Sequence, residues 1–100
     1  MSDEFVSWQS DGSVSIRLIT PVQRQNERVE CLTLRRLKAR DFAKVDFRAI
    51  ESGDVAACRP LIEALGNLTP GEVGDLDAAD YLLAVAQIGR LLQRPAAQLV

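Results

Sequence analysis

The feature that most constrains the fold is the segment 78–93, which is apolar around most of a helix. At about 100° per residue, its polar residues Asp80, Gln87 and Arg90 fall, with Arg94, into one strip about 80° wide. Nearly every other position is apolar, and a helix with so wide an apolar surface has to be covered on several sides. We expect the rest of the chain to cover about half of this surface, and a partner or a second copy to cover the remainder.

Two alternating segments near the N-terminus predict a β-hairpin over residues 14–36. From Ser13 to Leu18 apolar and polar residues alternate, which is the period of a strand with one buried face. Pro21 ends this strand or marks it as an edge. The polar run 23–28 connects it to a second strand-like segment over residues 29–35. Because two strands alone are barely stable in water, the hairpin has to lie on the helices that follow.

Helical spacing and capping signals predict three or four helices. One is expected within residues 39–52. A second opens at Asp54 and ends near Gly66, with a kink or a late start at Pro60. The run Thr69-Pro70-Gly71-Glu72 is a typical helix start, with Thr as the N-cap, Pro at the first helical position and Glu at the third. Asp77 then caps the last helix.

These elements define the predicted fold class and domain organisation. The class is α+β, an N-terminal β-hairpin packed on a small bundle of three to four helices, of which the last is longest. Residues 14–94 form a single domain, with the hairpin at 14–36 and a helical part at 39–94. Residues 1–13 are predicted to be a flexible arm and residues 95–100 a C-terminal tail.

Composition sets the class of protein. With 100 residues, 47% hydrophobic and 26% charged, the chain has the values of one globular domain. No run approaches the ~20 apolar residues of a membrane span, and the acidic start is unlike a secretory signal, so we expect a cytoplasmic protein.

Charge is unevenly distributed along the chain. Residues 14–48 carry nine Lys or Arg and four acids, while residues 49–80 carry one Arg and seven acids. The two halves either pair with each other or orient the chain on a partner.

The residue types argue against catalysis and against a bound cofactor or metal. The sequence has no histidine, which removes the commonest general base. Helix capping accounts for Asp54, Glu72, Asp77 and Asp80, and the glycines form no phosphate loop. Cys31 and Cys58 are too few for structural zinc, and we expect two small buried hydrophobic residues rather than a disulfide.

A basic cluster, residues 35–40 with Lys44 and Arg48, is the one feature that suggests nucleic acid. The pI of about 5.0 and the lack of interleaved aromatic residues argue against it. We interpret the cluster as a solvated strand end and helix start, and nucleic-acid binding is the less favoured interpretation.

Two blocks of sequence together resemble a known family. They are LTLRRLKARDF at residues 32–42 and LGNLTPGEVGDLDAADY at residues 65–81. In this order and at this distance they are similar to the tail assembly chaperones of Mu-like, contractile-tailed bacteriophages. The chain departs from the family pattern at Leu37, Arg40 and Pro60, where the family has proline, glycine and a residue other than proline. The second block, which is the more specific one, has no such departure.

The resemblance implies a non-enzymatic role in virion assembly. A chaperone of this family binds the tape-measure protein in the host cytoplasm, keeps it soluble until the tail tube polymerises around it, and is absent from the mature virion. We expect the last helix to supply the contact, in the helix-in-groove manner. A place in the core is the alternative for each candidate contact residue: Tyr81, Leu82, Val85, Ile88, Leu91 and Leu92.

The alternative function is a small adaptor that associates with itself and binds another polypeptide through its apolar C-terminal helix. It requires no membrane, nucleic acid or cofactor. A regulator that binds nucleic acid ranks third, and an enzyme last.

Overall fold

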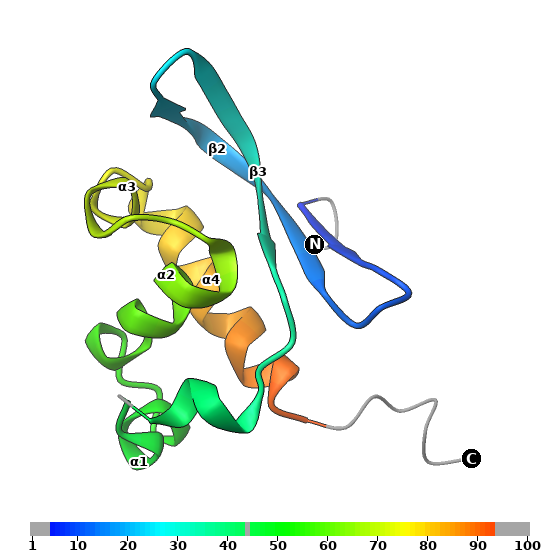
Figure 1. Ribbon diagram of the computed structural model, residues 1–100, viewed down its shortest axis with the longest axis vertical. Coiled ribbons are helices and arrows are strands. Elements are labelled where there is room, and N and C mark those ends of the chain that lie inside the picture. The colour runs from blue at the N-terminus through cyan, green and yellow to red at the C-terminus, as the bar shows by residue number, and fades with distance from the viewer. Residues whose placement is uncertain (1–4, 44, 94–100) are drawn as a thin grey trace.

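A three-stranded antiparallel sheet carries all of the helices on one face (Figure 1). The computed structural model describes residues 5–43 and 45–93. The strands, in sheet order, are β1 (Val6–Trp8), β2 (Val14–Arg24) and β3 (Glu27–Leu34). The helices are α1 (Phe47–Glu51), α2 (Arg59–Gly66), α3 (Pro70–Gly74) and α4 (Ala78–Leu91), with 3-10 turns η2 (Ala39–Phe42) and η3 (Ala56–Cys58). The predicted α+β class is confirmed, and α4 is the longest helix.

The core lies between the sheet and two of the helices. Helix α4 packs on β2 and α2 packs on β3, so each long helix has one strand as its main partner. Residues that are at most 3% exposed come from all four elements: Val14, Ile16, Leu32, Leu34, Leu61, Ile62, Leu65, Ala84, Ile88 and Leu91. The core is therefore aliphatic, and each large member contributes about 1.5–3 kcal/mol through burial. Within the described ranges, no helix is long and apolar enough to cross a bilayer.

Strand β1 is a correction to the predicted N-terminal arm. The prediction for residues 1–13 is wrong for Val6–Trp8, which pairs with β2 in the register Val6↔Ile16 and Trp8↔Val14. The turn before β2 contains Gly12 at φ +89°, and Asp11 accepts hydrogen bonds from the Ser13 backbone and hydroxyl. The pair Asp11-Gly12, which lies in the connection between β1 and β2, is a common turn signal, so the sequence contained a marker for this hairpin. Residues 1–4 lie outside the described residues.

Strand β2 continues through Pro21 instead of ending there. Its ladder with β3 is regular from Val14 to Arg17 and again from Val22 to Arg24. Between these two stretches, residues 18–21 of β2 face the single residue Glu30 of β3, which makes a wide irregularity. Proline has no N–H to give to the ladder, and the interruption removes the need for one.

The irregularity in β2 is closed by a side chain from α4. The Asp80 carboxylate accepts hydrogen bonds from the Ile19 N–H at 2.9 and 3.1 Å and from the Thr20 N–H at 3.3 Å. Asp80 is 1% exposed, and these hydrogen bonds replace the hydration that its carboxylate loses on burial. Asp80 lies in the first turn of α4, where a negative charge was expected, but its carboxylate bonds β2, and Asp77 caps the helix at the Ala79 N–H.

The helix predicted within residues 39–52 is broken. The structure has the short turn η2, then helix α1 with Asp46 as its N-cap, accepting from the Arg48 and Ala49 N–H groups. The extended backbone of Asp46 separates the two, so the spacing of Phe42 and Val45 did not reflect one continuous helix. Lys44 lies outside the described residues.

The remaining helix starts agree with the sequence. Pro60 stands in the first turn of α2, which confirms the late start. Thr69 and Glu72 form the predicted capping box of α3. Helix α2 ends at Gly66, and Asn67 after it is left-handed at φ +55°. Cys58 is buried as expected, but Cys31 is exposed, because it lies on the face of β3 away from the helices, opposite Arg17.

The substitution Asp80→Ala should lower the free energy of unfolding by about 2–4 kcal/mol, because it removes a fully buried side chain and leaves the Ile19 and Thr20 N–H groups without their acceptor. Urea denaturation followed by circular dichroism measures this. Asp75→Ala, which changes an exposed carboxylate just before α4, is the control and should cost less than about 0.5 kcal/mol. Equal losses for the two variants would contradict this role for Asp80.

Candidate functional site

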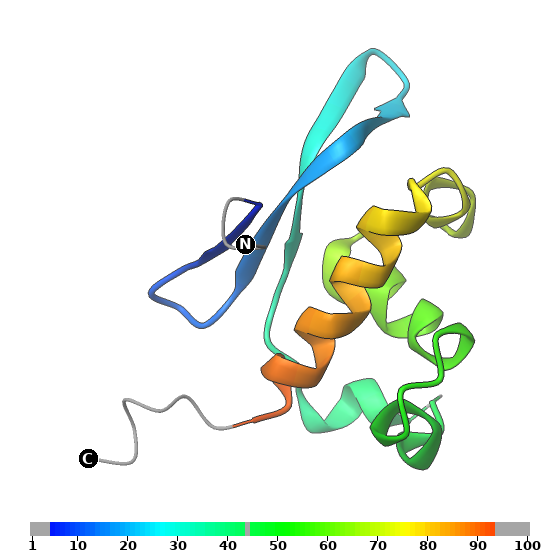
Figure 2. The same ribbon diagram turned by 180° about the vertical axis from the view of Figure 1, so that it is seen from behind.

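Helix α4 buries two of its polar residues and has an apolar stripe on its outer side. Asp80 and Gln87, from the polar strip of this helix, are 1% and 4% exposed and face the sheet. On the opposite side Ala79, Leu82, Ala86 and Gly89 are all exposed, and Leu82 is 54% exposed. Their spacing of three, four and three residues puts them on one line along the helix. Figure 2 shows this helix in front of α2, with no other element over its outer side.

The predicted contact residues divide into two groups. Leu82 is exposed, and Tyr81, Val85 and Leu92 are half-buried along the side of α4 that faces the other helices. Ile88 and Leu91, by contrast, are 0% and 1% exposed and belong to the core. A partner cannot reach these two without opening the fold, because they point at the sheet side of α4. Arg94 and residues 95–100 lie outside the described residues.

Tyr81 connects α4 to the segment before η3 through a hydrogen bond. Its hydroxyl donates to the backbone oxygen of Val55 at 2.6 Å, and partial burial raises the pKa of this phenol. Val55, the residue before η3, is itself 41% exposed.

A groove runs between α1 and the C-terminal half of α4. It measures about 550 Å³. Its apolar members are Phe47, Ile50, Ala86, Gly89 and Leu92, and its polar members are Glu51, Arg90 and Gln93. Nothing stands within 4 Å of where a Cβ on Gly89 would lie, so the helix surface is open there. The sequence did not indicate this groove, because it depends on the break between η2 and α1.

Phe47 forms the outer wall of the groove and is 44% exposed. Its ring meets that of Phe42 edge to face, with centroids 5.4 Å apart. This aromatic pair holds the short helix α1 in position beside α4.

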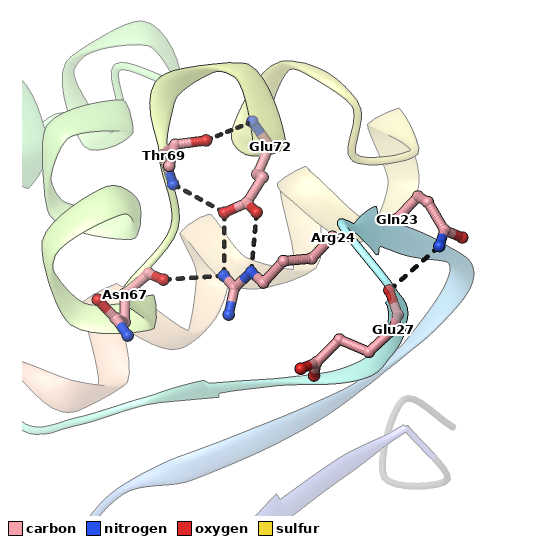
Figure 3. A network of polar contacts seen from close by, with 6 residues as sticks. All are labelled: Gln23, Arg24, Glu27, Asn67, Thr69 and Glu72. Atoms are coloured by element: carbon pink, nitrogen blue, oxygen red, sulfur yellow. Dashed lines mark hydrogen bonds and ion pairs between the residues drawn. The ribbon is translucent and has the colours of Figure 1, made fainter.

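A polar network joins the hairpin to the turn between α2 and α3 (Figure 3). The Arg24 guanidinium donates to both oxygens of Glu72 at 2.8 and 2.9 Å and to the Asn67 backbone oxygen at 3.1 Å. Glu72 also accepts from the Thr69 N–H at 2.9 Å, as the capping box requires. The guanidinium contact, with help from this N–H, lowers the pKa of Glu72 from 4.5 to about 2. The basic and acidic halves of the chain therefore do pair at this point.

A second ion pair shapes the link from β3 to the helices. Arg35 donates to both oxygens of Asp41 at 2.9 Å, and Asp41 also accepts from the Lys38 N–H at 2.7 Å. The Arg35 contact, followed by that N–H, holds the pKa of Asp41 well below its ordinary value. Arg35 and Asp41 thus serve the fold, while Lys38 and Arg40 of the basic cluster are exposed.

The candidate site is the outer surface of α4 with the groove beside it. The whole sequence contains no histidine. Among the described residues, no group of three or more Cys, Asp or Glu side chains is placed to hold a metal ion. An exposed apolar surface such as the stripe of α4 is typical of contact with another polypeptide.

Comparison with known proteins identifies the family. Residues 15–93 match the family described as phage tail assembly chaperone proteins, E, or 41 or 14, and the chain belongs to this family. The match covers the hairpin and all of the helices, and the family is one of chaperones rather than of enzymes. No curated protein and no solved structure matches the chain.

Replacing Gln87 with methionine should raise the free energy of unfolding by about 1 kcal/mol. The Gln87 Oε1 is buried and has no hydrogen-bond partner within residues 5–43 and 45–93, and an unpaired buried acceptor is costly. Methionine has a similar shape and removes the polar group. Thermal and urea denaturation measure the change, and a loss of stability would show that the amide makes bonds that methionine cannot replace.

The ion pair of Glu72 predicts a specific dependence on pH. Its folded pKa of about 2 lies below the ordinary 4.5, so the pair stabilises the fold above pH 4.5 and is lost as the pH falls toward 2. Glu72→Gln should therefore be less stable than the wild type at pH 7, and the difference should shrink between pH 4.5 and 2. Urea midpoints across this range measure it. Glu51→Gln, at an exposed carboxylate of α1, is the control and should change the stability at pH 7 less, and parallel curves for the wild type and Glu72→Gln would contradict the prediction.

Proposed function

We propose that the protein binds the tape-measure protein of a Mu-like, contractile-tailed phage in the host cytoplasm. It keeps that long protein soluble until the tail tube polymerises around it, and it is then left out of the mature virion. Membership in the tail assembly chaperone family supports a role in tail assembly. The motifs at residues 32–42 and 65–81 support the Mu-like origin and the identity of the partner.

The observation that carries the proposal is the orientation of α4. Besides its core residues the helix buries an aspartate and a glutamine, while it leaves Leu82 and Ala86 in water. Such an arrangement is unfavourable for an isolated chain and becomes favourable when another apolar surface covers the stripe. A helical client with its own apolar stripe provides that surface without any chemical step.

In this proposal the contact is made by those of the six predicted residues that are accessible. Leu82 is the centre, with Tyr81 and Val85 beside it and Leu92 at the groove. Ala86 and Gly89 join them, because small side chains let a second helix approach closely. Ile88 and Leu91 act indirectly by holding α4 on the sheet.

The same stripe also fits the alternative of a self-associating adaptor. A second copy presents an identical apolar stripe, and two such helices pair across a two-fold axis. Sedimentation of the purified chain separates the two functions, since an adaptor of this kind is a stable dimer that does not dissociate when the tape-measure protein is added.

Co-expression with the tape-measure protein of the same genome tests the proposal. A tag on this chain should bring down the long protein from the soluble fraction. The variant Leu82→Gln, combined with Ala86→Gln, should reduce the recovered amount at least about tenfold, because it replaces the apolar stripe with amides. Circular dichroism should show an unchanged fold, since both residues are exposed.

Ile19→Gln is the matched control. Ile19 is 61% exposed on β2, so the substitution removes a similar exposed apolar side chain from a different surface. It should leave recovery unchanged. If the wild type folds but the tape-measure protein stays insoluble and unbound, the proposal is wrong and the adaptor becomes the better account.

A further inference from the structure

We propose that residues 46–57 form a flap that opens as a unit while the sheet, α2 and α4 stay folded. The flap comprises the N-cap of α1, α1 itself, the turn after it and most of η3. Its opening frees the side of α4 on which Tyr81, Val85 and Leu92 lie. This goes beyond the proposed function and does not depend on the tape-measure protein, because it concerns the chain alone.

Little of the flap is buried, so little holds it on the domain. Within residues 46–57, Ile50 is the one buried side chain, at 6% exposed. Phe47 and Val55 are 44% and 41% exposed, and the other positions are exposed or half-buried. Figure 1 shows α1 at the end of the helical layer, away from the sheet. Segments with few buried apolar contacts open at a lower free energy than the core does.

Most hydrogen bonds of the flap are internal, so it can move without losing its own structure. Asp46 accepts from the N–H groups of Arg48 and Ala49, and the Ser52 hydroxyl donates to the Ala49 backbone oxygen. Asp54 accepts from two N–H groups of η3. No ion pair in the described part of the chain involves the flap.

A tyrosine hydrogen bond attaches the flap to α4. The Tyr81 hydroxyl donates to the Val55 backbone oxygen at 2.6 Å. Among residues 5–43 and 45–93, no other hydrogen bond joins the flap to a part of the chain beyond the adjoining start of α2. The closed form therefore depends on this bond and on the burial of Ile50.

The flap covers one side of α4. It reaches this helix near Tyr81 through Val55, and near Leu92 through Ile50, which lines the same groove. Val85 lies between these two points on the same side of the helix. Opening of the flap therefore widens the exposed apolar surface of α4 beyond the stripe that the closed domain offers to another protein.

Hydrogen exchange of backbone amides, followed by NMR on the purified full-length chain, tests the flap. Its reporters are the N–H groups of Ile50, Ser52 and Asp54, which bond within the flap. Tyr81→Phe should raise their exchange rates together by about fivefold, because it removes a hydrogen bond that only the closed form makes. Unequal or absent changes would mean that these residues fray separately, which overturns the proposal.

Two variants outside the flap supply the controls. Thr69→Val removes the hydroxyl that accepts a hydrogen bond in the capping box of α3, and Asp80→Ala removes the contact between α4 and β2. Both contacts persist when the flap opens, so both variants should leave the three flap rates unchanged. Asp80→Ala should nevertheless accelerate the amides of α4 at least about tenfold. Flap rates that rise with those of α4 would mean that the flap opens only with the whole domain, which also overturns the proposal.

Cys58 reports whether opening uncovers apolar surface. It is 2% exposed and directly follows the flap in the chain. In a Cys31→Ser background, which removes the exposed thiol, a thiol reagent should label Cys58 about fivefold faster with Tyr81→Phe and no faster with Asp80→Ala. If Asp80→Ala accelerates the labelling, or Tyr81→Phe does not, Cys58 stays covered until global unfolding and the proposal is overturned.

The outcome is distinguishable from that for the proposed function. Exchange and labelling use the purified chain, so a flap that stays closed overturns this inference whether or not the tape-measure protein co-purifies. A flap that opens in a chain that binds no tape-measure protein leaves the inference standing, and the proposed function falls.

Discussion

The structure depends on one contact, in which the Asp80 carboxylate of α4 accepts hydrogen bonds from the Ile19 and Thr20 N–H groups of β2. A buried carboxylate has to be satisfied by donors, and an interrupted strand has to find acceptors, so each group meets the need of the other. Because Asp80 points at the sheet, the rotation of α4 about its axis is determined along its whole length. Gln87, which lies on the same side of α4, is therefore buried as well, and Leu82, Ala86 and Gly89 are exposed. The exposed apolar stripe is thus a direct consequence of a polar contact in the core.

The other polar contacts position the elements around α4. Arg24 and Glu72 join the hairpin to the start of α3, and Arg35 and Asp41 shape the connection into the helical layer. These pairs are held in bidentate geometry, which restricts orientation more than a single contact does. A domain of 100 residues with an aliphatic core has limited stability, so such contacts matter for keeping α1 and α4 in the positions that form the groove.

A binding face of this kind suits a chaperone. In the proposed function its affinity comes from covering apolar surface, which requires no particular sequence in the client. Membership in the tail assembly chaperone family agrees with a protein that binds and releases rather than one that reacts. Within residues 5–43 and 45–93 the buried Gln87 Oε1 has no hydrogen-bond partner, so burying this side of α4 costs some stability.

The sequence by itself determined the local elements. Caps at Thr69 and Asp77, the proline at the start of α2 and the alternation from Val14 onward all act within a few residues of the chain, and each was found where predicted. The family motif is equally local. Only the tertiary structure decided which side of α4 faces water, because that depends on donors in β2, some 60 residues away in the chain. It also decided that Ile88 and Leu91 belong to the core while Leu82 does not. An apolar helix pattern shows how much surface must be covered, but only packing against a particular strand shows which part is covered by the chain itself.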